Sequence, residues 1–299
     1  MPKGVPSAGY RMTKNRMEKF GGVDPRHEAV QLYKKEEPEV QLIIETDSEI
    51  ETRLRDRFMI LSELTEAALC GDARAVIVSG PAGLGKSFTV EEKLRDWDPE
   101  QINHTIVKGY VKATGLLRLL YRFREAGQVI VFDDADSIFF DDTCLNMLKA
   151  VCDTTDRRTV SYMAEINMID EESAEQIPRH FEFEGTVIFA TNLDLDAMID
   201  RGHKLAPHLM ALVSRAHYVD LSMRTKRDYL VRIKQVVKDG MLKMHGLDAE
   251  QEAEVMEFID TNQEKLRELS LRIAVKIANL LKMGKGDWKR IARVTCLKQ

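Results

Sequence analysis

The sequence predicts an α/β fold in which a parallel sheet is covered by helices on both faces, followed by a small all-helical domain. Short apolar runs alternate with helical segments from about residue 75 to residue 190, which is typical of parallel sheets. A glycine-rich segment joins the first of these runs to a helix. After about residue 220 strand signals disappear and only helical periodicity remains. With 299 residues, 44% of them apolar, the chain can build a core in each domain.

The elements of the first domain follow from this alternation. Apolar residues recur at helical spacing over residues 48–70, and Gly71 is a suitable C-cap for that helix. A buried strand over residues 75–79 leads through the glycine-rich segment into a helix over 86–97. The remaining pattern predicts strands over 105–107, 129–132 and 186–190, and helices over 115–125 and 143–151.

Three further regions complete the predicted organisation. Residues 1–47 are rich in glycine, proline and charged residues, with basic residues prevailing in the first twenty, and predict an arm that is flexible or docks on a neighbour. The α/β core takes residues 48–220, and an insertion near 157–184 predicts a β-hairpin with an acidic tip at 167–172. Residues 221–299 predict the helical domain, with helices over 226–243, 249–259 and 271–282 and a basic C-terminal end.

Composition and charge exclude several protein classes. The net charge of −5 argues against a protein that coats nucleic acid non-specifically, although it is compatible with a local basic surface. The four cysteines show no metal-site spacing and predict neither a zinc site nor a disulfide framework. No apolar run approaches the roughly 20 residues that span a bilayer. We therefore expect a cytoplasmic protein with no membrane partner.

The strongest motif has the pattern G-x-x-x-x-G-K-[ST] and lies between the first predicted strand and the next helix, where a phosphate-binding loop needs to be. Glycines let backbone N–H groups turn toward phosphates, and the helix N-terminus adds positive potential. Lys86 is expected to neutralise the β- and γ-phosphates of ATP, and Ser87 to hold Mg²⁺. An ordinary glycine-rich turn is the discounted alternative. The motif consists of Gly80, Pro81, Ala82, Gly83, Leu84, Gly85, Lys86 and Ser87.

Two adjacent carboxylates follow the predicted strand at 129–132. Parallel strands present their carboxyl ends at one edge of the sheet, so Asp133 and Asp134 are expected beside the phosphate-binding loop. Asp133 is the predicted metal-side carboxylate, and Asp134 the candidate base that orients the attacking water. The alternative is a buried strand that ends in a polar turn.

On these two motifs the chain resembles the AAA+ superfamily of ATPases over about residues 51–283. The resemblance implies a P-loop core with a helical lid and carries over to three more residues. Asn192 resembles sensor 1, which places the attacking water, and Arg272 resembles sensor 2, which contacts the nucleotide from the lid. Arg215 resembles the arginine finger that reaches the γ-phosphate of a neighbouring subunit, with Arg201 as the competing candidate. A turn or a solvated surface charge is the alternative for each of them.

An arginine supplied in trans implies self-association into a ring, most often a hexamer in this family. Lys108, Tyr110 and Val111 follow the second strand, where such rings carry a pore loop that grips substrate. The alternative is that Tyr110 packs against the sheet. The family usually has Glu at the position of Asp134, so the shorter side chain predicts slow hydrolysis or a local adjustment.

The substrate is predicted less directly. The insertion at 157–184 resembles the hairpin of helicase and clamp-loader clades, and the motif style resembles compact ATPases of bacteriophages, which would act in the host cytoplasm. These features and the basic C-terminal end favour work on nucleic acid, although a solvated helical face is the commoner interpretation of that basic end. The acidic tip, with Asp170, Glu171 and Glu172, favours a protein partner instead. A protein remodeller and a nucleotide-dependent switch with slow turnover are therefore the alternative functions.

Overall fold

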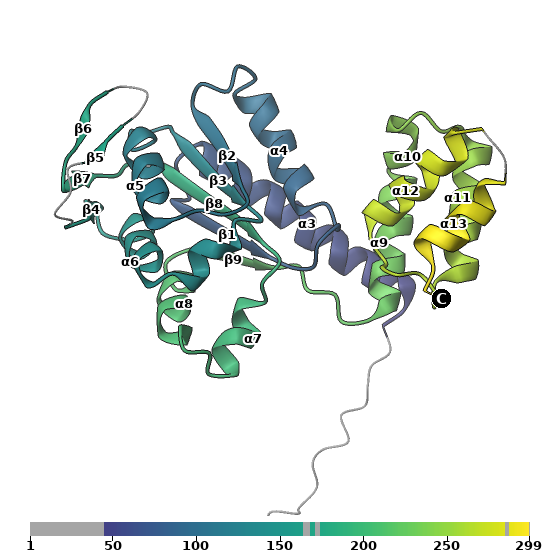
Figure 1. Ribbon diagram of the computed structural model, residues 1–299. Coiled ribbons are helices and arrows are strands. Elements are labelled where there is room, and N and C mark those ends of the chain that lie inside the picture. The colour runs from purple at the N-terminus through teal and green to yellow at the C-terminus, as the bar shows by residue number, and fades with distance from the viewer. Residues whose placement is uncertain (1–44, 164–167, 171–173, 285–286, 299) are drawn as a thin grey trace, which may run out of the picture. The chain divides into compact units, whose positions relative to one another are not determined.

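The computed structural model describes residues 45–163, 168–170, 174–284 and 287–298, so nearly all of the predicted N-terminal arm lies outside the described residues. A five-stranded parallel sheet forms the centre of the first domain (Figure 1). Its order is β2-β3-β8-β1-β9, and every neighbouring pair is parallel. The strands are β1 Ala75–Ser79, β2 His104–Lys108, β3 Val129–Asp133, β8 Thr186–Thr191 and β9 His217–Asp220.

The central strands are mainly apolar because both faces of the sheet are covered. β1, β3 and β8 are buried along their whole length. Side chains alternate between the faces, so Val76 and Val78 pack into one apolar cluster while Ile77 packs into another. On the second face Phe132 and Phe189 stack with their ring centroids 5.3 Å apart.

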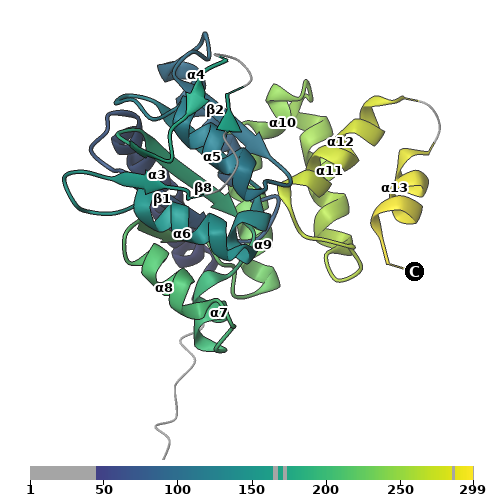
Figure 2. The ribbon, with the colours of Figure 1, turned by 60° about the vertical axis from the view of Figure 1, so that its left-hand side comes forward.

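Different helices cover the two faces (Figures 1 and 2). α3 Asp47–Leu69 and α4 Lys86–Trp97 bury their apolar sides against the cluster that contains Val76. α5 Ala113–Arg122, α6 Asp142–Val151 and α8 Ala206–Val213 cover the other face. Two short elements, the 3₁₀ turn η1 Asp136–Phe140 and α7 Leu195–Asp200, follow β3 and β8 at the edge where those strands end.

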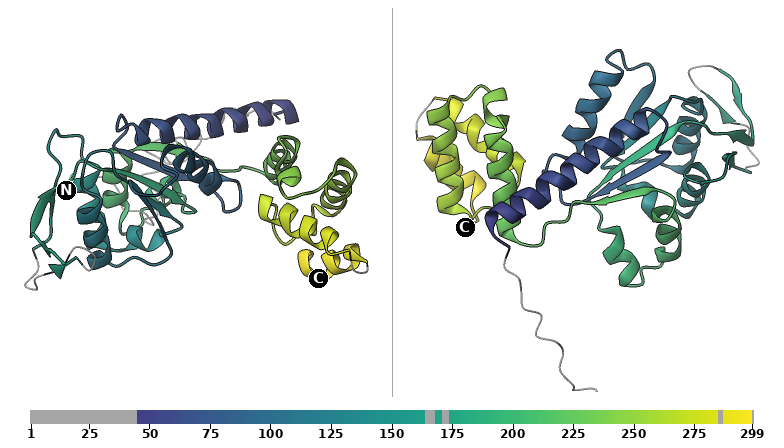
Figure 3. Two further views of the ribbon diagram at one scale, coloured as in Figure 1. Left: turned by 90° about the horizontal axis from the view of Figure 1, so that it is seen from above. Right: turned by 180° about the vertical axis from the view of Figure 1, so that it is seen from behind.

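Helix α3 extends from the core to the helical domain (Figure 3). A capping box between Thr46 and Glu49 satisfies its first N–H groups. Near this end Ile50 and Leu54 pack against Val231 of the helical domain, while the C-terminal part of the helix packs on the sheet. The helix is therefore shared by two cores.

The helical domain, called the lid below, contains α9 Lys226–Lys238, α10 Met241–Met244, α11 Ala249–Asn262, α12 Leu271–Lys282 and α13 Trp288–Cys296. One apolar cluster holds all five helices together. Polar contacts join the lid to α3: Asp228 lies 3.4 Å from the Arg53 guanidinium, and Gln235 donates to the Glu51 carbonyl at 3.2 Å. Asp228 is almost fully buried.

The predicted fold class, a parallel P-loop α/β core followed by a helical lid, is confirmed. Several elements differ from the sequence prediction, among them helices α7 and α8, which were not predicted. The edge strand β9 was not predicted, because among its residues only Val219 is fully buried. The helix predicted over 226–243 is two helices, since Gly240 adopts φ +100° between them. The basic C-terminal end, interpreted from the sequence as a basic patch or a solvated helical face, is the amphipathic helix α13.

The insertion near 157–184 contains two short antiparallel pairs. β4 Thr159–Ser161 pairs with β7 His180–Glu182, and β5 Met168–Ile169 pairs with β6 Gln176–Ile177. The second strand of the predicted hairpin is thus interrupted at Pro178, which has no N–H to donate. The tip residues Asn167, Glu171 and Glu172 lie outside the described residues.

Asp170, which was expected at an acidic tip facing a partner, is buried instead. Its side chain is only 3% exposed and lies 2.8 Å from the Arg122 guanidinium. The charge of this carboxylate is therefore compensated within the chain.

Within the described ranges, no helix is both long and apolar enough to cross a membrane.

Candidate functional site

The phosphate-binding loop connects the buried end of β1 to the start of α4. Gly85 is the N-cap of α4 with φ +102°, a left-handed conformation that favours glycine, and no side chain caps the helix. The first-turn N–H groups are therefore available to an anion, as the motif predicts.

Gly83 lets the lid approach the loop. The N–H of Leu271 donates to the Gly83 carbonyl at 2.8 Å, so the start of α12 is docked on the loop. Gly83 has φ +75°, and a Cβ there would lie 2.9 Å from the Ser270 Cβ and 3.4 Å from the Arg272 Cγ. The predicted sensor 2 arginine thus lies beside the loop, and its side chain is exposed.

Replacing Gly83 with Ala is expected to loosen the lid and lower stability. The substitution places a side chain in a left-handed conformation and drives its Cβ into Ser270. We expect a loss of about 1–3 kcal/mol in the free energy of unfolding. Gly71→Ala is the matched control, because Gly71 has φ +84° and nothing within 4 Å of the added Cβ. Thermal unfolding of both variants measures the difference, and equal losses would show that contact with the lid does not matter.

Lys86 is buried, with an exposed fraction of 4%, and its ammonium group has three partners. It donates to the carbonyls of Gly80 and Pro81 at 2.5 and 3.0 Å and to Asn192 Oδ1 at 2.9 Å. Burial lowers the pKa of Lys86 to about 8, and neighbouring carboxylates, Asp134 first, oppose that shift. Further negative charge in this site would stabilise the protonated form of Lys86.

Asp133 lies at the end of β3 and faces Ser87. The Ser87 hydroxyl donates to Asp133 Oδ1 at 2.6 Å, and the carboxylate is 5% exposed. Hydroxyl and carboxylate oxygens are the donors that Mg²⁺ prefers, so this pair fits the predicted metal site. Within the described residues no group of three or more His, Cys, Asp or Glu side chains could hold a metal. A magnesium ion here would therefore need further oxygens from a phosphate or from water.

Lys108 lies in this site, in a place that sequence reasoning did not assign to it. Its ammonium group is 3.0 Å from Asp133 Oδ2 and 2.7 Å from Glu91 Oε1. The contact follows from the sheet, since Lys108 and Asp133 are register partners at the ends of β2 and β3. The two carboxylates raise the pKa of Lys108, with the hydrogen bond to Glu91 as the largest cause.

Of the other two residues of the predicted pore loop, one is exposed and one is buried. Tyr110 is 77% exposed, so it does not pack against the sheet. Val111 is buried, and its N–H donates to the Ser137 hydroxyl at 2.9 Å.

Asn192 joins Lys86 to Asp134. Its side-chain oxygen accepts from Lys86, and its nitrogen donates to Asp134 Oδ1 at 2.7 Å. Asp134 itself is exposed and has φ +53°, an uncommon conformation for a residue other than glycine. The sequence-predicted base and sensor are therefore in direct contact beside the loop lysine.

Asp136 is a member of this cluster that sequence reasoning missed. Its carboxylate accepts from the Thr191 hydroxyl at 2.5 Å, and burial, together with the charge of Asp134, raises its pKa. The 3₁₀ turn that follows β3 brings Asp136 back toward the site. The signal was available as a third aspartate, three residues after Asp133.

Arg215 is not brought to this site within the chain. It precedes β9, and the first residue of β9, His217, is the register partner of Val76 in β1. Val76 lies near the start of β1, whereas the phosphate-binding loop follows the other end of that strand. The Arg215 guanidinium donates to the Ala211 carbonyl at 2.7 Å and lies 3.9 Å from Asp153. The competing Arg201 is the exposed C-cap residue of α7.

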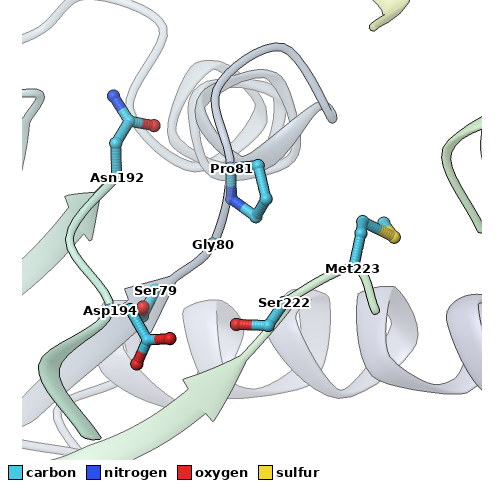
Figure 4. A pocket seen from close by; sticks show the side chains of 7 residues that line it. All are labelled: Ser79, Gly80, Pro81, Asn192, Asp194, Ser222 and Met223. Atoms are coloured by element: carbon cyan, nitrogen blue, oxygen red, sulfur yellow. The ribbon is translucent and has the colours of Figure 1, made fainter. Parts of the chain in front are cut away.

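Two cavities adjoin the phosphate-binding loop. One, of about 270 Å³, separates Gly80 and Pro81 from Asn192, and the side chains of Asp194 and Ser222 point toward each other across it (Figure 4). The other, of about 330 Å³, lies between Pro81 and the lid. The loop is thus open to ligands on both sides.

Comparisons with known proteins found a sequence relative and several solved structures with a similar fold. No family model matches the chain. Solved structures with a similar fold include ATP-bound NtrX from Brucella abortus (14% identity, TM-score 0.43), covering 88% of this chain and 56% of that chain. They also include the RuvB Holliday junction branch migration motor of Thermotoga maritima (15%, TM-score 0.46), covering 81% of this chain and 68% of that one. A third is domain III of the replication initiation protein DnaA from Thermotoga maritima (12%, TM-score 0.45), with coverages of 82% and 92%.

Likenesses at this level carry no conclusion about activity. The sequence relationship is much stronger. The chain is 34% identical over 279 residues to the uncharacterized 36.7 kDa protein in the nrdC-mobD intergenic region of Enterobacteria phage T4. The aligned residues make up 91% of this chain and 85% of the relative. The chain belongs to the family of that phage T4 protein.

Proposed function

We propose that the protein is an AAA+ ATPase that binds ATP with Mg²⁺ and hydrolyses it. The observation that carries the proposal is the single cluster formed by Lys86, Asn192 and Asp134 beside the phosphate-binding loop. Three separate sequence segments supply these side chains, and the parallel register brings them to one edge of the sheet. Exposed N–H groups, a lysine and a carboxylate are the parts that phosphoryl transfer to water requires.

Each residue of the cluster has a role in the proposed reaction. The loop N–H groups and Lys86 hold the phosphates, and Arg272 contacts them from the lid. Ser87 and Asp133 would hold magnesium, which would offset the negative charge of the phosphate oxygens. Asp134 accepts a proton from water, and Asn192 orients the Asp134 carboxylate through its 2.7 Å hydrogen bond.

Replacing Asp134 with Asn tests the catalytic part of the proposal. The amide cannot accept a proton from water, so we expect turnover to fall by about 100-fold or more while ATP affinity is retained. Phosphate release and binding of a fluorescent ATP analogue measure the two effects. Asp134→Glu is the companion variant and lengthens the side chain by one methylene. Faster hydrolysis by Asp134→Glu would favour the alternative that the natural chain is a nucleotide-dependent switch with slow turnover. Normal turnover by Asp134→Asn would show that Asp134 has no role in the reaction.

We further propose that the active form is a ring, a hexamer in the usual arrangement of this superfamily. Arg215 supports this, because it lies at the edge of the sheet away from its own phosphate-binding loop. A finger in that position can serve only a neighbouring subunit.

Nucleic acid is the substrate we propose, with action in the cytoplasm of a bacterial host. The relationship to a phage T4 protein and the basic end of the lid favour it. The ion pair of buried Asp170 with Arg122 compensates one of the acidic charges that argued against a nucleic-acid substrate. A protein substrate is the second candidate, favoured by the 77% exposure of Tyr110 in the proposed pore loop, although Val111 of that loop is buried and Lys108 pairs with Asp133 and Glu91. ATPase rates with single-stranded DNA, duplex DNA and unfolded protein would separate the two.

A further inference from the structure

Positive charge is concentrated in the lid. In the whole chain Asp and Glu outnumber Lys and Arg, 49 to 44, but the order is reversed in residues 221–299. Within the lid the charges are also segregated, since α11 has acidic residues and no lysine or arginine. The basic residues gather elsewhere, on α13 and on the segment that pairs with its end.

Helix α13 turns its basic residues outward. Trp288, Ala292 and Cys296 recur every four residues and face the apolar core of the lid. Arg290 and Arg293, one turn apart, are exposed on the other side. The helix is therefore held by its apolar side and presents two guanidinium groups to solvent.

A short β-bridge directly after α13 carries three more exposed cations. The N–H of Lys298 donates to the Lys265 carbonyl at 2.7 Å, and the N–H of Arg267 donates to the Cys296 carbonyl at 2.9 Å. Between them Leu266 and Leu297 form the bridge and are buried. Side chains alternate in extended backbone, so Lys265, Arg267 and Lys298 are exposed. The five residues Lys265, Arg267, Arg290, Arg293 and Lys298 are called the lid basic surface below.

Acidic side chains neutralise other lid cations but not these. Lys226, Lys234 and Lys276 each form an ion pair with a lid carboxylate. No ion pair involves a member of the lid basic surface among the described residues. Five cations gathered without acidic partners repel one another, and a bound polyanion would remove that repulsion.

The lid basic surface also reaches the phosphate-binding loop. Arg267 and Lys298 line the 330 Å³ cavity whose opposite wall includes Pro81 and Ala82. An anion bound along the surface would therefore lie next to the loop that is proposed to bind nucleotide.

We propose that the lid basic surface binds the phosphate backbone of a nucleic acid. The inference rests on the proposed function and names the surface that carries out its substrate contact. Protein interfaces have an apolar or aromatic centre, whereas nucleic-acid interfaces are polar and positively charged. The lid basic surface fits the second description, since the large apolar residue exposed on α13 is Val294 alone.

The double variant Arg290→Glu/Arg293→Glu tests this assignment. Fluorescence anisotropy with labelled duplex and single-stranded DNA, measured over a range of salt concentrations, gives affinity and its salt dependence. We expect affinity to fall about tenfold or more, and the slope of log K against log salt to become shallower by about 2. Lys238→Glu/Lys243→Glu, on α9 and α10, is the matched control with the same change in charge and should bind within about twofold of the natural protein.

The outcomes separate this inference from the proposed function. Equal DNA affinity of the two double variants would overturn the lid basic surface while leaving nucleic-acid binding in place. If the natural protein binds neither DNA form, the proposed substrate fails along with the surface. If Arg290→Glu/Arg293→Glu alters the mass of the assembly in the absence of DNA, the surface is a contact between copies and the assignment is wrong. Unchanged ATP affinity and thermal unfolding show that the variant is folded.

Discussion

Replacing Lys86 with Ala is expected to abolish nucleotide binding. The ammonium group is the only charged donor buried within the loop itself among the described residues, and each charge-assisted hydrogen bond contributes about 1.5–3 kcal/mol. Loss of contacts to two phosphates therefore predicts a decrease in ATP and ADP affinity of about 100-fold or more. Isothermal titration calorimetry with Mg²⁺ present measures it. Affinity close to that of the natural protein would contradict the assignment of the whole site.

Two further variants separate the effect of the Lys86 charge from its structural role. Lys86 holds the carbonyls of Gly80 and Pro81, so its loss can also loosen the loop. Lys86→Met keeps much of the buried aliphatic volume and should lose binding to the same degree. Lys93→Ala is the control on the same helix, because Lys93 pairs with Glu66 away from the loop and should leave affinity unchanged.

The parts of the fold that were predictable are those whose pattern is set by nearby residues. Continuous apolar runs predicted β1, β3 and β8 because both faces of these strands are buried. Edge strand β9 was not predicted, because it pairs on one side only and its sequence carries mostly polar side chains. Helix α13 was predicted only as one of two interpretations of the basic end, because its buried positions are largely small, as at Ala292 and Cys296, and do not stand out as an apolar stripe.

The candidate site shows the same division. The loop and Asp133 were found from spacing because strand, loop and helix are consecutive in sequence. Lys108 and Asp136 were placed by strand register and by a 3₁₀ turn, which a one-dimensional pattern does not contain. Asn192 was expected beside the nucleotide, but its bridge between Lys86 and Asp134 required the neighbouring strands to be in place.

Replacing Arg215 with Ala is expected to leave nucleotide affinity unchanged and to lower turnover about a thousandfold. The reason is distance within the sheet. His217 pairs with Val76, which lies three residues before Ser79 at the end of β1. About 10 Å of strand therefore separates His217 from the start of the phosphate-binding loop. Arg215 lies two residues further away and bonds the Ala211 carbonyl. Its side chain cannot serve its own site, so its removal should not affect binding there.

Mixing variants tests whether Arg215 acts on a neighbour. Arg215→Ala retains an intact phosphate-binding loop but has no finger, whereas Lys86→Ala retains the finger and binds no nucleotide. Each is expected to be nearly inactive alone, and a mixture should recover turnover because a Lys86→Ala neighbour supplies Arg215 to a loaded site. Arg201→Ala is the matched control. Loss of turnover in Arg201→Ala with normal turnover in Arg215→Ala would transfer the role to Arg201, and absence of rescue in mixtures that assemble would show that catalysis does not cross the subunit boundary.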